Sequence, residues 1–428
     1  MTHLIRDTGH SPFFNIFEGG KQLWRQILLF CLLTLSHPIL KNQAYALYEK
    51  LRENDPIHKI TLPNGKTGWV VTRYKDAAAT LKKERLTKNL FQFMHSEDVG
   101  LPQKQMNLMF KHMLNTDQPD HTRLRSLVQK AFTPRMIEKL NGRVQEISDS
   151  LIDKVESRED MELIQDYAYP LPIIVICEML GLPSEERDQF RKWSNALVSS
   201  MNVPKKYKQI VPDTIAFTNY IKSLIERRRQ DPKEDLLSLL TQAESENGKL
   251  SEMELVSMIF LLIIAGHETT VNLIGNGTFT LLQHPEQLEE LRRTPSLIGS
   301  AIEELLRFMG PVEFATNRWA GEGFEWEGKA ISKGDIVLVG LASANRDPES
   351  FKHPERLDLT RENNNHLAFG MGIHHCLGAP LARMEGRIAI NTLLRRLPNL
   401  KLAVSPDCLK WQPSYLMRGF DALPLRFR

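Results

Sequence analysis

Apolar residues recur at helical spacing over most of the chain, and the clearest such segment begins at Ser251. Ser251 and Glu254 form the S-x-x-E pattern of a capping box, and the apolar run that follows continues to about Gln283, just before Pro285. At 1.5 Å per residue this helix would be on the order of 50 Å long, enough to cross a whole domain. We therefore expect a long central helix around which the rest of the chain packs.

Shorter helices and a few strands are predicted on both sides of this helix. Helices are expected within 44–56, 74–86, 117–132, 136–154, 171–180, 186–201, 211–232, 301–308 and 380–396. A β-hairpin is expected around Asn64-Gly65, and further strands within 312–320, 328–348 and 399–428. The pattern predicts a mainly α fold with small β-sheets, class α+β, in a single large domain over 36–428.

Residues 1–35 do not share this pattern and are assigned to an N-terminal extension. Its apolar stretch, Ile27–Leu35, is far shorter than the roughly 20 residues that span a bilayer, so no stable membrane span is expected. Lys21 and Arg25 precede the stretch, as in a signal peptide, but the leader is long and no clear cleavage site follows. A dispensable tail is the preferred interpretation; a packed extra helix and a peripheral membrane contact are the alternatives.

Charge and cysteine content narrow the class of protein. The chain has 428 residues, of which 55 are basic and 52 acidic, giving a net charge of +3. No dense basic run is present, so nothing indicates a nucleic-acid partner. The four cysteines show no disulfide framework, which is expected of a protein in the reducing cytoplasm.

The candidate chemistry centres on Cys376, which lies in the stretch HLAFGMGIHHCLGAPLAR among Gly370, Gly372 and Gly378. A helix is predicted from about Ala379, so unpaired backbone N–H groups and the positive end of the helix dipole would face the sulfur. Such a position is expected to favour thiolate over thiol. The glycines would let the backbone approach a flat, bulky group.

Two other interpretations of Cys376 fit the sequence less well. An inert core cysteine behaves as a small hydrophobe but does not require flanking glycines. Zinc is conceivable beside His374 and His375, yet the chain has no CxxC and lacks the spacings of a structural zinc site.

The stretch resembles the haem-binding signature of the cytochrome P-450 family at every fixed position, namely Phe369, Gly370, Gly372, His374, Cys376, Gly378, Leu381, Ala382 and Arg383. The resemblance covers nearly everything from about Asn42 to Arg428. It implies the cytochrome P-450 fold, with haem b (iron protoporphyrin IX) between the long central helix and the helix that follows the cysteine. Cys376 would be the axial thiolate ligand of the iron.

The middle of the central helix carries a second candidate site, in the stretch AGHETT. Glu268 follows a nearly uniform apolar run, and a buried carboxylate without a partner is unfavourable. Thr269 can bond back to a carbonyl one turn earlier and bend the helix. The stretch resembles the family's oxygen-activation motif, in which Glu268 and Thr269 would relay protons, and Ala265 and Gly266 would keep the helix thin over the haem.

Several basic residues are candidates for holding the haem propionates. His121 and Arg125 share a helix face at i,i+4 spacing. The resemblance assigns these two residues, together with Arg318 and His374, to the propionates. It also identifies Glu304 and Arg307 as a buried pair that supports the cysteine loop, a structural role.

The resemblance implies a haem-thiolate monooxygenase that hydroxylates an unactivated C–H bond with O₂. The stretches DHTRLRSLVQKAFTPR, SANRDP and HHCLGAPLAR are most similar to soluble bacterial members that hydroxylate macrolides and other polyketide products, as in Bacillus. The substrate would be a bulky, mostly apolar small molecule: a polyketide, macrolide, statin-like lactone or steroid.

No flavin or ferredoxin domain is recognisable, so a separate ferredoxin or flavodoxin with its reductase would supply electrons, docking near Arg123 and Lys130. A monomer is expected. The alternatives are a peroxygenase driven by hydrogen peroxide, a non-catalytic haem-binding protein and a haemless thiol or zinc protein.

Overall fold

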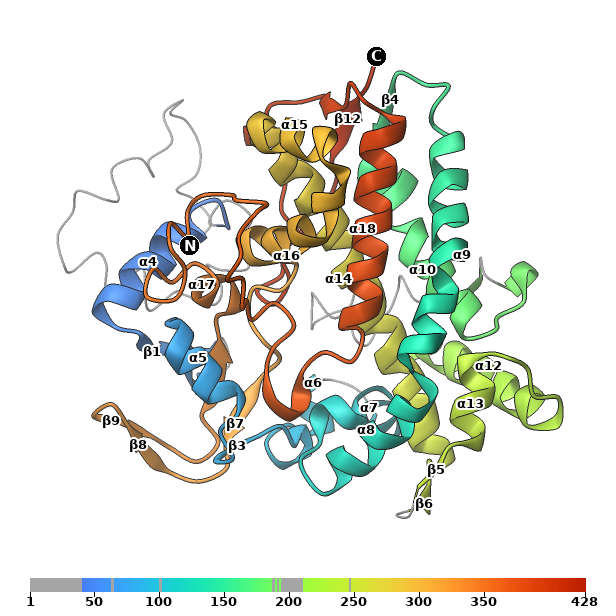
Figure 1. Ribbon diagram of the computed structural model, residues 1–428. Coiled ribbons are helices and arrows are strands. Elements are labelled where there is room, and N and C mark those ends of the chain that lie inside the picture. The colour runs from blue at the N-terminus through green and yellow to red at the C-terminus, as the bar shows by residue number, and fades with distance from the viewer. Residues whose placement is uncertain are drawn as a thin grey trace, which may run out of the picture.

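The computed structural model describes residues 41–428, apart from 63–64, 100–101, 187–188, 191, 194–210 and 246–247. The predicted N-terminal extension, Asn64 and most of the helix expected over 186–201 therefore lie outside the described residues. In the described part, the chain is mainly helical with small sheets, as predicted (Figure 1).

The central helix, α14 (Glu252–Gln283), is 32 residues long and confirms the prediction at both ends. The Ser251 hydroxyl accepts from the Glu254 backbone N–H, and the Glu254 carboxylate accepts from the Ser251 backbone N–H. Most of its side chains are buried, because α7, α10, α16 and α18 all pack against it. α14 is also long and apolar enough to span a bilayer, but it serves here as a core helix, with most of its apolar window buried.

Other helices surround α14. In the described residues they are α4 (Ala44–Asn54), α5 (Tyr74–Leu81), α6 (Ser96–Val99), α7 (Gln103–Phe110), α8 (Asp120–Ala131), α9 (Pro134–Asp153), α10 (Pro170–Met179), α12 (Val211–Gln230), α13 (Leu236–Gln242), α15 (Pro285–Arg293), α16 (Ile298–Met309), α17 (Leu341–Ala344) and α18 (Ala379–Arg396). Figure 1 shows α18, in red, running beside α9, and these two helices pack directly on one another.

The largest sheet of the described residues lies beside the helical part of the molecule. Its strand order is β1 (Ile57–Thr61), β2 (Thr67–Val71), β10 (Ile336–Val339), β7 (Arg318–Ala320) and β3 (Leu86–Thr87). β1 and β2 form the predicted antiparallel hairpin. The smaller sheets are β11 (Lys401–Leu402), β12 (Pro424–Arg426) and β4 (Asp160–Glu162), and the hairpins β5 (Glu244–Ser245) with β6 (Gly248–Lys249) and β8 (Phe324–Trp326) with β9 (Lys329–Ile331).

The strand predicted over 312–320 is wrong for its first part. Val312 and Phe314 make only isolated bridges, and the regular strand begins at Arg318. One backbone group of the intervening residues is used elsewhere: the Asn317 carbonyl accepts a hydrogen bond from the ammonium of buried Lys88 and not from a neighbouring strand.

The boundary between α8 and α9 also differs from the prediction. Thr133 and Pro134 were expected only to end the first helix. In the structure they also begin the second: the Thr133 hydroxyl accepts from the Met136 backbone N–H over 3.2 Å, and Pro134 occupies the first turn.

Candidate functional site

The cysteine loop has the glycine geometry that its sequence predicts. Gly370 and Gly372 have φ of 69° and 78°, a region that favours glycine. A Cβ on Gly372 would also lie 3.0 Å from the Leu81 carbonyl oxygen. The Cys376 backbone N–H donates to the Phe369 carbonyl over 2.9 Å, and α18 begins at Ala379. The loop thus presents an exposed cysteine side chain just before a helix N-terminus.

Two opposing effects of the protein act on the charge of this sulfur. Although the Cys376 side chain is exposed, the protein around it removes enough water to raise the pKa of the thiol, and this desolvation outweighs the backbone N–H groups of Gly378 and Ala379 and the charge of Arg125, which all lower it. The predicted stabilising donors are therefore present, but the protein alone does not favour the thiolate. A bound metal ion deprotonates a coordinating thiol outright, so the anion is expected only with the metal in place.

α14 is open to solvent at one place along its buried length. Ala265 is exposed, and Gly266, Glu268 and Thr269 are half-buried, although their neighbours on the helix are mostly buried. A Cβ on Gly266 would meet only the Ile176 side chain, at an ordinary 3.7 Å. The Thr269 hydroxyl donates to the Ala265 carbonyl over 2.7 Å, the predicted bond to the preceding turn. This open section is where a flat ligand can approach the helix.

A buried acid on the other side of this section was missed from the sequence. Glu385 of α18 is 2% exposed and is hydrogen-bonded to the Thr270 hydroxyl. Burial raises its pKa to about 8, so the carboxyl group is protonated at neutral pH. In the sequence, Glu385 looks the same as the exposed carboxylates of an amphipathic helix. Its burial becomes evident only from the packing of α18 on α14.

The candidate propionate residues His121, His374 and Arg318 are buried or half-buried, and the described residues offer them few acceptors. The two histidine rings lie 4.3 Å apart, centroid to centroid. Within the described residues, neither nitrogen of His121 nor Nε2 of His374 has a hydrogen-bond partner, and Arg318, 4% exposed, donates only to the Thr316 carbonyl, over 3.2 Å. Burial lowers the pKa of His374 to about 2 and that of Arg318 to about 10, because positive charge is disfavoured there.

Arg125 faces the cysteine loop from α8. Its Nη2 donates to the His375 carbonyl over 2.8 Å, and it is close enough to Cys376 for the two groups to shift each other's pKa. Arg125 thus lies next to the cysteine loop. Close to it are His121, in the first turn of α8, and His374, the last residue of the short turn before Cys376. Another buried cation of this region, Lys88, was not predicted.

This donor set fits haem. Orphaned buried nitrogens and unpaired cations need acceptors, and the two propionates of haem are anionic acceptors. A single exposed sulfur next to a glycine-lined backbone matches an iron that takes one axial ligand from the protein. In the described residues, no group of three His, Cys, Asp or Glu side chains is placed to hold a metal ion.

Two ion pairs connect α16 to the chain on either side of the loop. Glu304 and Arg307 of α16 are fully buried and share two hydrogen bonds of 2.7 and 2.8 Å. Arg361 also donates to Glu304, over 3.0 Å. Nearer the cysteine, Arg383 makes a bidentate pair with Glu303, at 2.7 and 2.8 Å, while its guanidinium lies 4.4 Å from the Phe369 ring centre.

Arg123, which was expected near the docking site of the redox partner, makes ion pairs within the protein. Its guanidinium pairs with Glu254, the capping residue of α14, and with Asp120, so its charge is neutralised within the protein.

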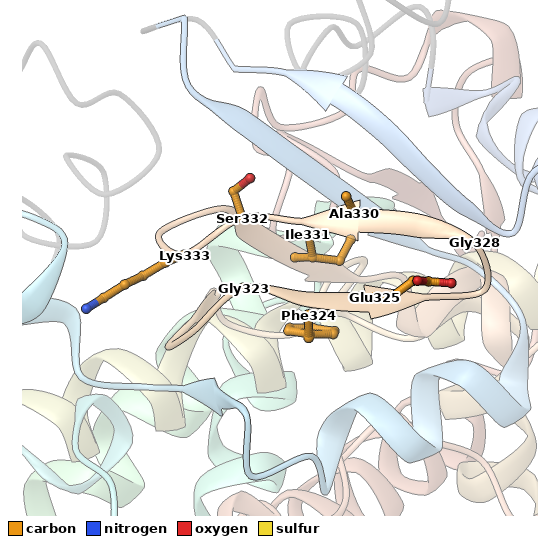
Figure 2. A pocket seen from close by; sticks show the side chains of 8 residues that line it. All are labelled: Gly323, Phe324, Glu325, Gly328, Ala330, Ile331, Ser332 and Lys333. Carbon is orange, nitrogen blue, oxygen red and sulfur yellow. The ribbon is translucent and has the colours of Figure 1, made fainter.

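A pocket beside the β8–β9 hairpin is not the cofactor site. Figure 2 shows that its walls all come from the β8–β9 hairpin, around Phe324 and Ile331, and no predicted site residue lines it.

Comparison with known proteins agrees with this geometry. The cytochrome P450 family model matches residues 24–294 and 296–410. A cytochrome P450 of Bacillus subtilis is 48% identical over 394 residues, covering 92% of this chain and 96% of its own. The polyketide biosynthesis cytochrome P450 PksS, also from Bacillus subtilis, is 45% identical, covering 90% and 96%.

The solved structure of PksS superposes with a TM-score of 0.87, covering 92% of this chain and 99% of its own. The family model and the shared fold both imply the cofactor of the family, so haem b is the prosthetic group. The chain therefore belongs to the cytochrome P450 family and is a cytochrome P450 monooxygenase.

Proposed function

We propose that the protein hydroxylates an unactivated C–H bond of a bulky, mostly apolar small molecule of the polyketide or macrolide type. The observation that carries the proposal is the opening in α14, where Ala265 and Thr269 are accessible in an otherwise buried helix. Such an opening serves O₂ and a substrate above the cofactor. PksS, whose name places it in polyketide biosynthesis, supports this substrate class.

Residues from several elements would hold the cofactor. Cys376 would supply the sulfur ligand of the iron, with Phe369, Gly370 and Gly378 forming its loop. His121, Arg125, Arg318 and His374 are proposed to donate to the propionates, and each charge-assisted bond contributes roughly 1.5–3 kcal/mol. Ala265 and Gly266 are proposed to make room on the distal side. Haem, when bound, supplies the activation of O₂ and the insertion of one oxygen atom into the C–H bond.

Hydroxylation consumes one O₂, two electrons and two protons, and releases water with the alcohol. Glu268 and Thr269 are proposed to move these protons. Because the Thr269 hydroxyl donates to the Ala265 carbonyl, its lone pairs face outward as acceptors for a water molecule. Glu268, one residue earlier, would transfer protons from solvent to that water molecule.

The electrons are proposed to come from a separate ferredoxin or flavodoxin with its reductase in the cytoplasm. A monomer is sufficient for this scheme, since every proposed site residue comes from one chain. Residues 1–35 are proposed to be dispensable for it.

Reconstitution of the holoprotein with ferredoxin, reductase and NADPH tests the proposal. Candidate polyketides, macrolides, statin-like lactones and steroids are first screened for a shift in the spin state of the haem, and the binders are then assayed for a hydroxylated product. We expect product that depends on O₂ and NADPH. Product that forms only with hydrogen peroxide would establish the peroxygenase instead, and binding without any oxidation would contradict an enzyme.

A further inference from the structure

A buried lysine outside the family motifs lies beside the cations proposed to face the propionates. Lys88 follows β3 and is only 2% exposed. Its Nζ donates to the Thr316 hydroxyl over 2.7 Å and to the Asn317 carbonyl over 2.9 Å. Both acceptors are neutral, so the ammonium has an N–H group left over, and no carboxylate of the described residues is bonded to it.

The nearest carboxylate does not fill this gap. Asp117 accepts from the backbone N–H groups of Lys88 and Asn89, over 2.9 and 3.3 Å, and from the Thr87 hydroxyl. Its oxygens are therefore committed to the backbone of this segment and not to the ammonium. In the described residues, Lys88 has no salt bridge to any carboxylate.

Lys88 and Arg318 both donate a hydrogen bond to Thr316. The Lys88 ammonium holds the Thr316 side chain, and the Arg318 guanidinium donates to the Thr316 carbonyl. Arg318 also has no carboxylate partner in the part of the chain that the structure describes, and the two cations repel each other. Burial lowers the pKa of Lys88 well below its usual range, and the charge of Arg318 lowers it further, while the charge of Asp117 opposes both effects. An anion close to both groups would remove this repulsion and favour the charged form of Lys88.

We propose that Lys88 is a carboxylate-binding residue and that, together with Arg318, it holds one haem propionate. The propionate is favoured over a carboxylate of the substrate because Arg318 belongs to the same acceptor-poor cluster as His121 and His374. The inference rests on the propionate role proposed above for Arg318. It adds a cation that no P450 motif in this sequence identifies.

The test compares holoprotein variants by the rate at which they lose haem to an excess of apomyoglobin. Lys88→Met removes the charge, and Lys88→Gln removes the charge while its amide can still donate to the two neutral acceptors. We expect both variants to lose haem at least about tenfold faster than the unmodified protein, with a more negative reduction potential of the iron. If Lys88 only positioned the Thr316 segment, Lys88→Gln would match the unmodified protein in both measurements.

Lys41→Met is the matched control, since Lys41 is equally buried but lies 4.0 Å from the Glu313 carboxylate and donates to the Met417 carbonyl. Its haem transfer rate should stay unchanged even where its stability falls. Repeating the transfer with haem dimethyl ester, which lacks free propionates, should abolish the difference between Lys88→Gln and the unmodified protein. A difference that persists with the ester would overturn the proposal.

Three further outcomes separate this inference from the proposals on which it rests and from a role in substrate binding. If Arg318→Met accelerates haem loss and Lys88→Gln does not, only the role of Lys88 fails. If neither does, the propionate cluster itself is wrong. If Lys88→Gln retains haem but no longer prefers a fatty acid over the matching alcohol in a spin-state titration, the ammonium serves a substrate carboxylate.

Discussion

The Thr269 hydroxyl donates a 2.7 Å hydrogen bond to the Ala265 carbonyl, one turn earlier, at the place where α14 opens to solvent. Thr270, the next residue, makes a similar but longer bond of 3.3 Å to the Gly266 carbonyl and is 2% exposed. Two adjacent hydroxyls thus make the same backbone contact, but only one of them is accessible to water in the proposed active site.

This difference predicts distinct outcomes for two adjacent substitutions. Thr269→Ala should still consume O₂, but the product formed per O₂ should fall at least about tenfold, because a positioned proton donor contributes 10²–10⁴-fold. Oxygen uptake and product are measured in the same reaction. Thr270→Val is the control: it should keep the ratio of product to O₂ while lowering thermal stability, since it leaves Glu385 without its hydroxyl partner. Equal coupling in both variants would contradict a proton role for Thr269.

Glu385 should make the fold less stable as the pH rises. Its pKa is about 8 in the fold against an ordinary 4.5, so its contribution is fully present below about pH 4.5 and is lost as the pH rises through 8. At 1.36 kcal/mol per pKa unit, this amounts to roughly 3–5 kcal/mol between pH 4.5 and 9. Glu385→Gln should flatten that slope in urea unfolding. An unchanged slope would show that Glu385 does not titrate as described.

Glu303 should have the opposite effect on the pH dependence of stability. Its pKa is held at about 2, because hydrogen bonds from His366 and Arg383 outweigh the burial that alone would raise it. The stability that it contributes is present above pH 4.5 and is lost as the pH falls towards 2. Glu303→Gln should therefore lower stability at pH 7 and narrow the difference between pH 7 and pH 3. An acid dependence equal to that of the unmodified protein would contradict the pairing.

The buried pair of Glu304 and Arg307 should be necessary for the cysteine loop. Arg307→Ala leaves a buried carboxylate whose other donors, Arg361, Asn364 and the Asp358 N–H, cannot replace the two lost bonds, so we expect a loss of about 3–5 kcal/mol and poor haem retention. Arg143→Ala is the control. Arg143 also pairs with two carboxylates, but on the surface, where such pairs contribute about 0–1 kcal/mol. Comparable losses of unfolding free energy in the two variants would refute the distinction.

Sequence reasoning succeeded where local chemistry determines structure. The capping box at Ser251 and Glu254, the glycines before Cys376 and the bond from Thr269 to Ala265 are local features, and the structure has all three. Long amphipathic segments were equally predictable, because a helix shows its buried face in its periodicity.

Prediction from the sequence failed where a side chain contacts residues that are far away along the chain. Lys88 reaches residues 316 and 317, and Glu385 meets Thr270, and neither contact leaves a pattern in the chain. The same lysine bonds to the Asn317 carbonyl, within the strand expected before Arg318. The electrostatics of Cys376 were predictable only in part for a related reason: local donors were visible in the sequence, but the desolvation that opposes them depends on the whole fold.

Removal of residues 1–35 should leave the haem content and the substrate-induced spectral shift unchanged, as expected of a dispensable extension. The natural limit for truncation is Lys41, because Arg418 donates to its carbonyl over 3.0 Å and Glu313 lies beside its ammonium. A second deletion that also removes residues 36–42 should lower stability and haem content. Haem content is measured as the absorbance ratio of haem to protein. Loss of haem in the shorter deletion would contradict the assignment of the extension.

The central claim is that the sulfur of Cys376 is the axial ligand of the haem iron. The most direct test is the absorption spectrum of the reduced holoprotein under carbon monoxide, recorded for the unmodified chain and for Cys376→Ala. We predict the red-shifted band of a thiolate-ligated iron in the unmodified protein and its complete loss in the variant. A spectrum without that band, or an identical one from Cys376→Ala, would contradict the account.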